Sequence, residues 1–347
     1  MGDPPAALEI AAMVPGDAAI RSEPDFEWML ASVHFLSHDF AAAEKPLLDL
    51  FRSLRASANH KAAESRLALP PPHRQVLIGL VASDLPANSG VAAPGAPTER
   101  LLREYAAEAE ALASRGAKVI VLPEHLGAIE DRPHAQSADA IFQVLADNTN
   151  ATIVAGVSQA SPPAKYNQAR IYAPGTAVLT YDKHHLLPPV EFMFTPGKTL
   201  TVLREPSAIW GVAICKDMDF AGLSRNYGAA GVGLMLVPAW DFDLDRLWHG
   251  HIAVMRGVED GFSVARAARN GYLTVSDDRG RILAEVRSDR SPFATLMALA
   301  PATHDPTPYL LFGDWFAWLT LAALVFTLVQ LIRLRILRPQ VQEAIAD

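Results

Sequence analysis

Ile209-Trp210-Gly211-Val212-Ala213-Ile214-Cys215-Lys216-Asp217 is an apolar run that ends at the only cysteine of 347 residues and continues into a charged pair. The run predicts a buried strand, and the carboxyl end of such a strand in an α/β sheet faces the crevice where these folds bind ligands. A thiolate is a strong nucleophile once a neighbouring group takes its proton. A lone cysteine in an apolar run is more often a small buried hydrophobic side chain, so catalysis requires a base from elsewhere in the chain.

Composition limits the classes of function. Half of the residues are hydrophobic, which is enough for a sizeable core, and 30 basic against 38 acidic residues give a net charge of −8. This balance argues against nucleic-acid binding. A single cysteine excludes an internal disulfide and a cysteine-rich zinc cluster.

The middle of the chain alternates strands and helices. Residues 76–82 form a short apolar run, a helix is expected from Thr98 until Gly116 ends it, and residues 118–122 are a second apolar run that leads into Pro123 and Glu124. A strand, helix and strand followed by an acid are typical of α/β folds.

Further elements follow with the same patterns, but they include hairpins. We expect helices at 137–148 and 247–259, and strands at 152–157, 167–172, 176–181, 234–237, 262–267, 272–276 and 282–286. Hairpins mixed with helices predict sheets of mixed direction with helices outside them.

The ends of the chain differ from this middle part. Residues 1–72 are alanine-rich and read as helical or poorly ordered up to a proline linker. Residues 315–332 carry no charge and are long enough for a transmembrane helix, after a juxtamembrane segment at 301–314. Three arginines follow at the start of the tail, 333–347, whereas no arginine lies between Ser291 and Asp314. The positive-inside rule therefore predicts a cytoplasmic C-terminus. The catalytic domain, which we place at residues 73–300, would then lie on the other side of the membrane.

Three residues in this domain suit acyl transfer. Glu124 can take the proton of Cys215, the sulfur can attack a carbonyl, and Lys183 can stabilise the developing oxyanion and keep the thiolate ionised. Taken singly, Glu124 could be a helix N-terminal acid and Lys183 a solvated loop cation. Their convergence is a prediction about the fold.

These residues lie in motifs that resemble the nitrilase (carbon-nitrogen hydrolase) superfamily, over about residues 74–290. The motifs are Leu122-Pro123-Glu124, Tyr166-Asn167-Gln168-Ala169, Tyr181-Asp182-Lys183-His184-His185-Leu186, Gly211-Val212-Ala213-Ile214-Cys215, Arg256-Gly257-Val258-Glu259 and Arg266-Ala267-Ala268-Arg269-Asn270-Gly271. The resemblance implies a four-layer αββα sandwich. It also implies a thioester on Cys215, with Glu124 as general base and Lys183 at the oxyanion.

Within that superfamily, further features resemble the apolipoprotein N-acyltransferases. They are the lysine loop, Glu191 at the place of a second essential glutamate, and the approach to a final membrane helix. The resemblance implies a phospholipid acyl donor, a lipoprotein amine as acceptor, and a membrane location.

The sequence also departs from that pattern. Lys216 and Asp217 follow the cysteine where the family has an aromatic residue and a glutamate, and Leu122 stands where a tryptophan is typical. Asp217 keeps a carboxylate and is a candidate supporting residue, whereas Lys216 could lower the thiol pKa or point into solvent. Residues 1–70 do not supply the family's membrane bundle, which is consistent either with a longer protein or with a divergent relative that has one anchor.

Two more residues are candidates for substrate binding. Trp240 follows a strand and a proline, and His125 directly follows Glu124. We expect no metal and no cofactor, because His249 and His251 are two residues apart and cannot share a helix face. Arg256 and Glu259 are expected to form a structural ion pair.

Three functions remain in competition. The first is a membrane-anchored acyltransferase acting on phospholipid and lipoprotein. The second is an amidase or nitrilase that hydrolyses a small substrate. The third is an inactive scaffold, in which Cys215 would react with iodoacetamide no faster than free cysteine.

Overall fold

The computed structural model describes residues 74–85, 90–188, 190–206, 208–242, 246–315 and 317–330. The alanine-rich region predicted at 1–72 and the tail predicted at 333–347 lie outside the described residues.

The first sheet is built on three parallel strands. Its spatial order is β13 (Ala294–Pro301), β1 (Gln75–Ala82), β2 (Val119–Val121), β4 (Thr152–Ser161), β5 (Ala164–Tyr172) and β6 (Leu179–Asp182), with β3 (Ala128–Ile129) pairing with β4. β1, β2 and β4 are parallel, and antiparallel strands flank them on both sides.

The second sheet repeats this plan. Its order is β12 (Ile282–Arg287), β11 (Tyr272–Ser276), β10 (Ser263–Arg269), β9 (Leu234–Trp240), β8 (Ala208–Val212) and β7 (Thr201–Glu205). Here β8, β9 and β10 are parallel, and the outer strands are antiparallel.

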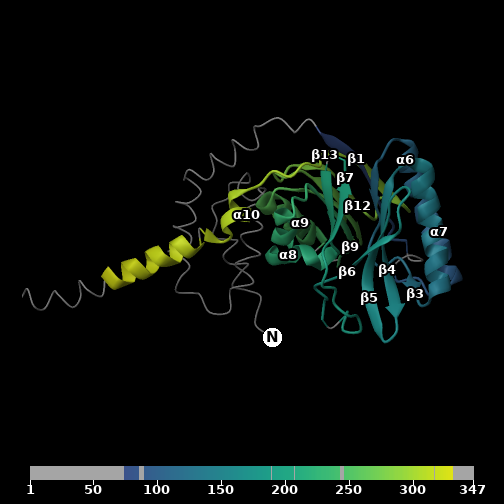
Figure 1. The fold of residues 1–347 in the computed structure, drawn as a ribbon, viewed down its shortest axis with the longest axis horizontal. Helices are drawn as coiled ribbons and strands as arrows, with labels where there is room; N and C mark the ends of the chain where they lie inside the picture. The colour runs from purple at the N-terminus through teal and green to yellow at the C-terminus, as the bar shows by residue number, and fades with distance from the viewer. Residues whose placement is uncertain are drawn as a thin grey trace, which may run out of the picture. The chain divides into compact units, whose positions relative to one another are not determined.

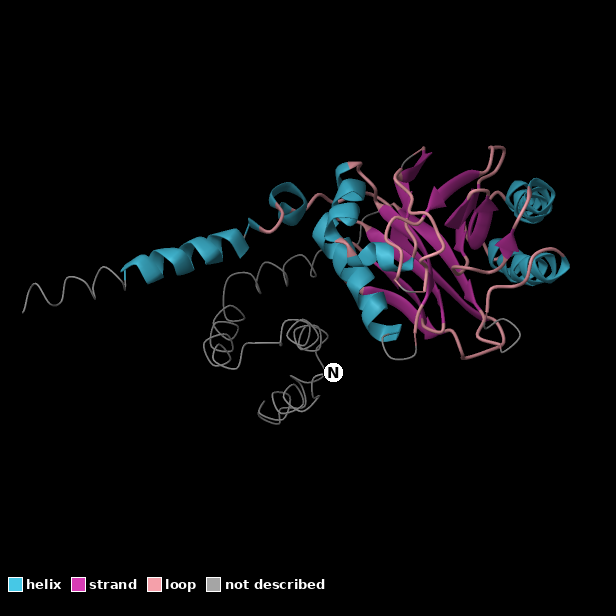
Figure 2. Ribbon diagram, turned by 90° about the horizontal axis from the view of Figure 1, so that it is seen from below, coloured by secondary structure: helices cyan, strands magenta, loops and turns pink. Residues whose placement is uncertain are grey.

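The two sheets face each other, and helices cover both outer faces (Figures 1 and 2). α6 (Ala96–Ser114) and α7 (Arg132–Thr149) lie on the first sheet, and α8 (Ala221–Ala229) and α9 (Arg246–Asp260) lie on the second. This arrangement confirms the predicted α/β sandwich of the nitrilase type.

Two hydrophobic cores hold the layers together. One includes Ile78 and Val121 of the first sheet with Val212 and Leu236 of the second, all fully buried. The other lies beneath α6 and α7 and contains Phe142. Strands between two layers are apolar on both faces, which explains the continuous apolar runs in the sequence.

The predicted strands and helices are present, but three features of the sheets were not expected. The edge strand β13 runs antiparallel along the whole of β1, from Gln75 opposite Pro301 to Ala82 opposite Ala294. β4 and β5 form a long hairpin, and β7 pairs with β8. β13 pairs with a strand distant in sequence and β7 was not predicted as a strand, whereas β4 and β5 extend towards each other beyond the predicted ranges 152–157 and 167–172.

The carboxyl ends of the parallel strands meet at one edge. Glu124 follows β2, Cys215 follows β8 and Trp240 ends β9. The backbone N–H of Glu124 donates to the carbonyl of Ala239 at 3.3 Å, which ties the two sheets together at this edge.

The chain beyond β13 continues into α10 (Pro308–Phe312), where the Thr307 hydroxyl accepts a capping bond from the Leu310 N–H at 3.0 Å. Residues 317–330 are helical. Within the parts of the chain that the structure describes, no helix combines the length and apolar character that crossing a bilayer requires. The predicted span 315–332 includes residues 316, 331 and 332, which lie outside the described residues.

Candidate active site

Cys215 lies on a tight turn three residues after β8. It begins the short 3-10 helix η2 (Cys215–Asp219) and has a φ of 44°, in the left-handed region that non-glycine residues seldom adopt. Its side chain is buried, with 8% of the residue exposed, and its sulfur donates to the Trp240 carbonyl at 3.5 Å. A strained backbone at a strand end is a common feature of reactive sites.

Asp217 holds this turn in place. Its fully buried carboxylate accepts from the backbone N–H of Ile214 at 3.1 Å, from the Tyr181 hydroxyl at 2.7 Å and from the backbone N–H of His185 at 2.8 Å. Tyr181 belongs to β6, and His185 belongs to the loop after β6 that carries Lys183. Asp217 therefore connects the cysteine turn to the lysine loop, which gives a structural basis for the supporting role predicted for it.

Glu124 lies on a second constrained turn. The next residue, His125, has a φ of 55°. Gly156 of β4 lies so close that a Cβ there would be 2.5 Å from the Glu124 Cα. Only glycine fits at that position, so the glycine in β4 allows the turn to approach the sheet.

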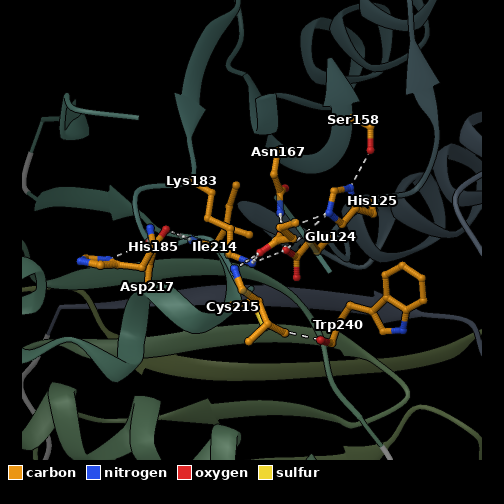
Figure 3. A network of polar contacts seen from close by, with 12 residues as sticks. Glu124, His125, Ser158, Asn167, Lys183, His185, Ile214, Cys215, Asp217 and Trp240 are labelled. Carbon is orange, nitrogen blue, oxygen red and sulfur yellow. Dashed lines mark hydrogen bonds and ion pairs between the residues drawn. The ribbon is translucent and has the colours of Figure 1, made fainter. Parts of the chain in front are cut away.

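Lys183 connects the two carboxylates of the site (Figure 3). Its ammonium donates to Glu124 Oε1 at 2.8 Å and to Glu191 at 3.0 and 3.2 Å. All three side chains are nearly fully buried. Figure 3 shows Lys183, Glu124 and Cys215 converging from the loop after β6 and from the ends of β2 and β8.

Asn167 is a member of this cluster that was not proposed as a site residue. Its amide donates to Glu124 Oε1 at 2.5 Å and to Glu191 Oε1 at 2.6 Å. Glu191 also accepts from the backbone N–H of Leu187 at 2.7 Å. The signal available in the sequence was the Tyr166–Ala169 motif, in which Asn167 and Gln168 are both buried and Asn167 is fully so.

The charges of the cluster favour ionised groups. Burial alone would lower the pKa of Lys183, but Glu124, Cys215 and Glu191 outweigh it and raise that pKa above its ordinary value. Burial acts to raise the pKa of Glu191, yet hydrogen bonds from His125 and the charge of Lys183 lower it to about 2. Glu191 is thus an anion that balances Lys183.

The surroundings of Cys215, by contrast, favour the neutral thiol over the thiolate. Burial raises its pKa above the ordinary value and the Glu124 carboxylate raises it further, while Lys183 acts against both. The expectation that Lys183 keeps the sulfur ionised at rest therefore differs from the structure, because burial and the neighbouring carboxylate outweigh the ammonium. Because the pKa of the thiol is raised, attack requires a base that takes its proton.

The two predicted substrate-binding residues lie beside this cluster. His125 shares hydrogen bonds with Ser158 at 2.6 Å and Glu191 at 3.4 Å. Its ring lies 6.2 Å from the ring of Trp240, and the guanidinium of Arg269 lies 4.0 Å from the Trp240 ring centroid. Both residues are positioned at the edge of the site.

Lys216 points away from the nucleophile. Its ammonium is 3.6 Å from Asp219 and 5.9 Å from the ring centroid of Phe220. Of the two readings of this lysine, the solvent-facing one fits these contacts.

A second buried ion pair lies close to the sulfur. Asp241 accepts from Arg266 through both oxygens, at 2.8 and 2.5 Å, and both residues are almost fully buried. His249 Nδ1 is 3.6 Å from the same carboxylate. Arg266 begins one of the motifs quoted above, but its pairing with Asp241 was not predicted, because it depends on β9 and β10 lying side by side.

Among the described residues, two groups of side chains have a geometry that could hold a metal ion: Glu124 with His125 and Glu191, and Cys215 with Asp241 and His249. The first already surrounds the Lys183 ammonium, and the second contains a carboxylate bonded to Arg266. A divalent cation would face a fixed positive charge in each group.

Comparison with known proteins shows the family and the fold of this chain. A family model described as carbon-nitrogen hydrolase matches residues 91–293. An amidase of the nitrilase superfamily from Nesterenkonia AN1 superposes with a TM-score of 0.57 at 20% identity, covering 67% of this chain and 94% of that one.

Curated relatives point to two kinds of enzyme. Apolipoprotein N-acyltransferase of Vibrio cholerae is 39% identical over 169 residues, which cover 41% of this chain and 33% of that protein. Omega-amidase NIT2 of Danio rerio is 29% identical over 146 residues, covering 36% of this chain and 52% of that protein. The chain thus matches about a third to a half of the length of these relatives.

Proposed function

Because the chain belongs to the carbon-nitrogen hydrolase family, we propose that it forms an acyl thioester on Cys215 and passes the acyl group to an amine. The observation that carries this proposal is the convergence of a thiol, a carboxylate and an ammonium in one buried cluster, with the Lys183 ammonium 2.8 Å from Glu124. Glu191 and Asn167 complete the cluster as groups that orient Lys183 and Glu124.

The first half-reaction follows from this arrangement. Glu124 takes the proton of Cys215, and the sulfur attacks the acyl carbonyl of the donor. The negative charge on the carbonyl oxygen develops beside Lys183, where an ammonium held in a dry site stabilises it strongly. The bond to the leaving group then breaks, and Glu124 returns the proton to that group.

We propose a phospholipid as the acyl donor and the amine of a lipoprotein as the acceptor. Apolar side chains next to Glu191 support an apolar donor: Val190, Phe192 and Met193 have 57%, 78% and 50% of their surfaces exposed. Exposed apolar side chains grouped beside a reactive site are typical of lipid or protein contact. The match to apolipoprotein N-acyltransferases supports the same reading.

A membrane anchor is part of this proposal. The uncharged segment at 315–332 would hold the domain on the non-cytoplasmic side, with the C-terminus in the cytoplasm. Both substrates would then reach the site from the bilayer.

Hydrolysis of a small amide is the second candidate. The match to an omega-amidase covers 52% of that protein, a larger share than that of the first acyltransferase. In this case water replaces the amine, and the same three residues act.

The test uses the full-length protein and a phospholipid with a labelled acyl chain. We expect label on Cys215 as a hydroxylamine-sensitive adduct in the intact mass, and transfer of that label to a lipopeptide bearing a free N-terminal amine. Cys215→Ala is the control and must remain unlabelled.

Two results separate the candidates. Equal labelling of wild type and Cys215→Ala would refute the thioester. Turnover of short soluble amides, without labelling by phospholipid, would favour the amidase.

A further inference from the structure

Cys215 has a second set of acid–base groups beside it, in addition to the Glu124 cluster. Its sulfur, a carboxylate oxygen of Asp241 and a ring nitrogen of His249 lie within 4.8 Å of one another. Asp241 directly follows β9, and His249 lies on α9. Both belong to the half of the domain that carries the second sheet, whereas Glu124, Lys183 and Asn167 belong to the first half.

Asp241 is fixed as an anion. Burial acts to raise its pKa, but Arg266 and His249 hold it below the ordinary value. Arg266 binds both carboxylate oxygens, so the carboxylate cannot rotate freely. Its Oδ1 faces His249 Nδ1 at 3.6 Å, which would orient the ring and stabilise an imidazolium. A carboxylate, an imidazole and a thiol gathered this closely are groups that enzymes combine for acyl transfer.

In the Glu124 cluster, by contrast, a carboxylate oxygen already accepts hydrogen bonds from two neighbouring side chains. Glu124 Oε1 accepts from Lys183 and from Asn167, so this oxygen is committed to holding those two side chains. The leaving group of the first half-reaction and the acceptor of the second are different molecules under the proposed function. With two proton-transfer groups beside one sulfur, one group can act on the leaving group and the other on the acceptor.

We propose that His249 is a catalytic residue that takes the proton of the acceptor in the second half-reaction. The acceptor nitrogen attacks the thioester carbonyl, a C–N bond forms and the N–H proton passes to the His249 imidazole. The C–S bond then breaks, its electron pair stays on sulfur, and the thiolate takes the proton from the imidazolium. Thioester and amine become amide and thiol, with nothing else consumed. This inference rests on the proposed thioester function.

The neighbouring histidine provides a matched control. His251 is two residues further along α9, about 200° around the helix, so it cannot face the same group. It is also half-buried. A substitution at His251 therefore controls for general effects of changing a histidine on this helix.

The experiment uses full-length His249→Gln with p-nitrophenyl butyrate as donor and glycinamide as acceptor. Release of p-nitrophenolate measures acylation, and the intact mass measures the thioester on Cys215. We expect acylation within threefold of wild type, a slower transfer to glycinamide by about 10²-fold, and accumulation of acyl-enzyme. His251→Gln should behave as wild type. In His249→Gly, added imidazole should restore transfer at least tenfold.

Other outcomes refute one proposal or the other. Transfer at the wild-type rate in folded His249→Gln, or equal slowing of both half-reactions without imidazole rescue in His249→Gly, would overturn the role of His249. If the wild type itself forms no adduct on Cys215 with this donor or with labelled phospholipid, the proposed function fails instead.

Discussion

Two clusters of carboxylates among the described residues of this domain are balanced in opposite ways. At the site, Glu124 and Glu191 share the Lys183 ammonium, with Asn167 and His125 as further partners of Glu191. At the C-terminal end of α9, Glu259 pairs with Arg256 at 2.9 Å, as predicted, but burial and the nearby charges of Asp260 and Asp314 act against it.

The difference shows in the pKa of each glutamate. The pKa of Glu191 is lowered to about 2, and that of Glu259 is raised by burial to about 7. The environment of Glu191 therefore favours the charged carboxylate, whereas that of Glu259 favours the neutral carboxyl group. What decides is the number of donors that reach the carboxylate, because burial opposes the charge in both places.

The largest effect expected concerns Glu124. Glu124→Gln should slow acylation by about 10³-fold, because the general base is lost. The carboxylate also raises the pKa of the Cys215 thiol, so its removal should lower that pKa. Alkylation by iodoacetamide as a function of pH measures the thiol, and release of p-nitrophenolate measures the rate. A fall in rate without a downward shift of the alkylation profile would contradict the charge coupling.

Lys183 tests the balance of the site cluster directly. Lys183→Met should slow acylation by about 10²–10³-fold through loss of oxyanion stabilisation. It should also lower the free energy of unfolding by about 3–5 kcal/mol, because two buried carboxylates lose their shared cation. Urea unfolding near pH 7 measures the second effect. Asn167→Leu, which removes only a neutral donor, is the comparison and should cost less stability.

The acidic cluster on α9 should make stability depend on pH. Since the pKa of Glu259 rises from 4.5 to about 7 on folding, the folded state holds the proton more tightly than the unfolded state. Its contribution is complete below pH 4.5 and is lost as pH rises to 7, by up to about 3 kcal/mol. Glu259→Gln should flatten urea-unfolding stability across this window. An unchanged slope would show that Glu259 does not titrate there.

Glu191 should give the opposite slope at acid pH. Its pKa is lowered on folding, so its contribution is present above pH 4.5 and is lost as the pH falls towards 2. Between pH 4.5 and 3 we expect wild type to lose about 2 kcal/mol that Glu191→Gln does not lose. An equal loss of unfolding free energy in wild type and Glu191→Gln over this range would show that the pKa of Glu191 is not lowered on folding.

The smallest effect is expected at Lys216. Its ammonium faces Asp219, and it is not among the charges that shift the Cys215 pKa. Lys216→Ala should change the acylation rate by less than about threefold, because this partly exposed ion pair is local to η2 and ion pairs near the surface contribute little. A larger loss of acylation rate, measured with the same p-nitrophenyl ester, would show that Lys216 contributes to the reaction.

The sequence predicted much of the domain because its signals are local. Apolar runs at 76–82, 118–122 and 209–214 mark strands, and a residue that follows such a run lies at a sheet edge. This logic brought Glu124 and Cys215 to one edge. The edge strand β13 was not predicted in this way, because its alternation of buried and exposed residues results from its pairing with β1.

The roles of polar neighbours were less accessible. Asn167 was visible only as part of a motif, and the pairing of Asp241 with Arg266 depends on the parallel register of β9 and β10. No spacing in the chain predicts that His249, on a helix of the second half, lies within 4.8 Å of the sulfur.

By itself, then, the sequence determined the α/β class, most strands in their order along the chain, and that Glu124 and Cys215 follow strand ends, because hydrophobic periodicity and turn residues act between near neighbours along the chain. Only the tertiary structure decided which charges face the sulfur, that burial and Glu124 raise the pKa of the thiol, and that Asp241 and His249 adjoin it. Hydrogen bonds and pKa values depend on distances through space, and those distances exist only once the two sheets have packed together.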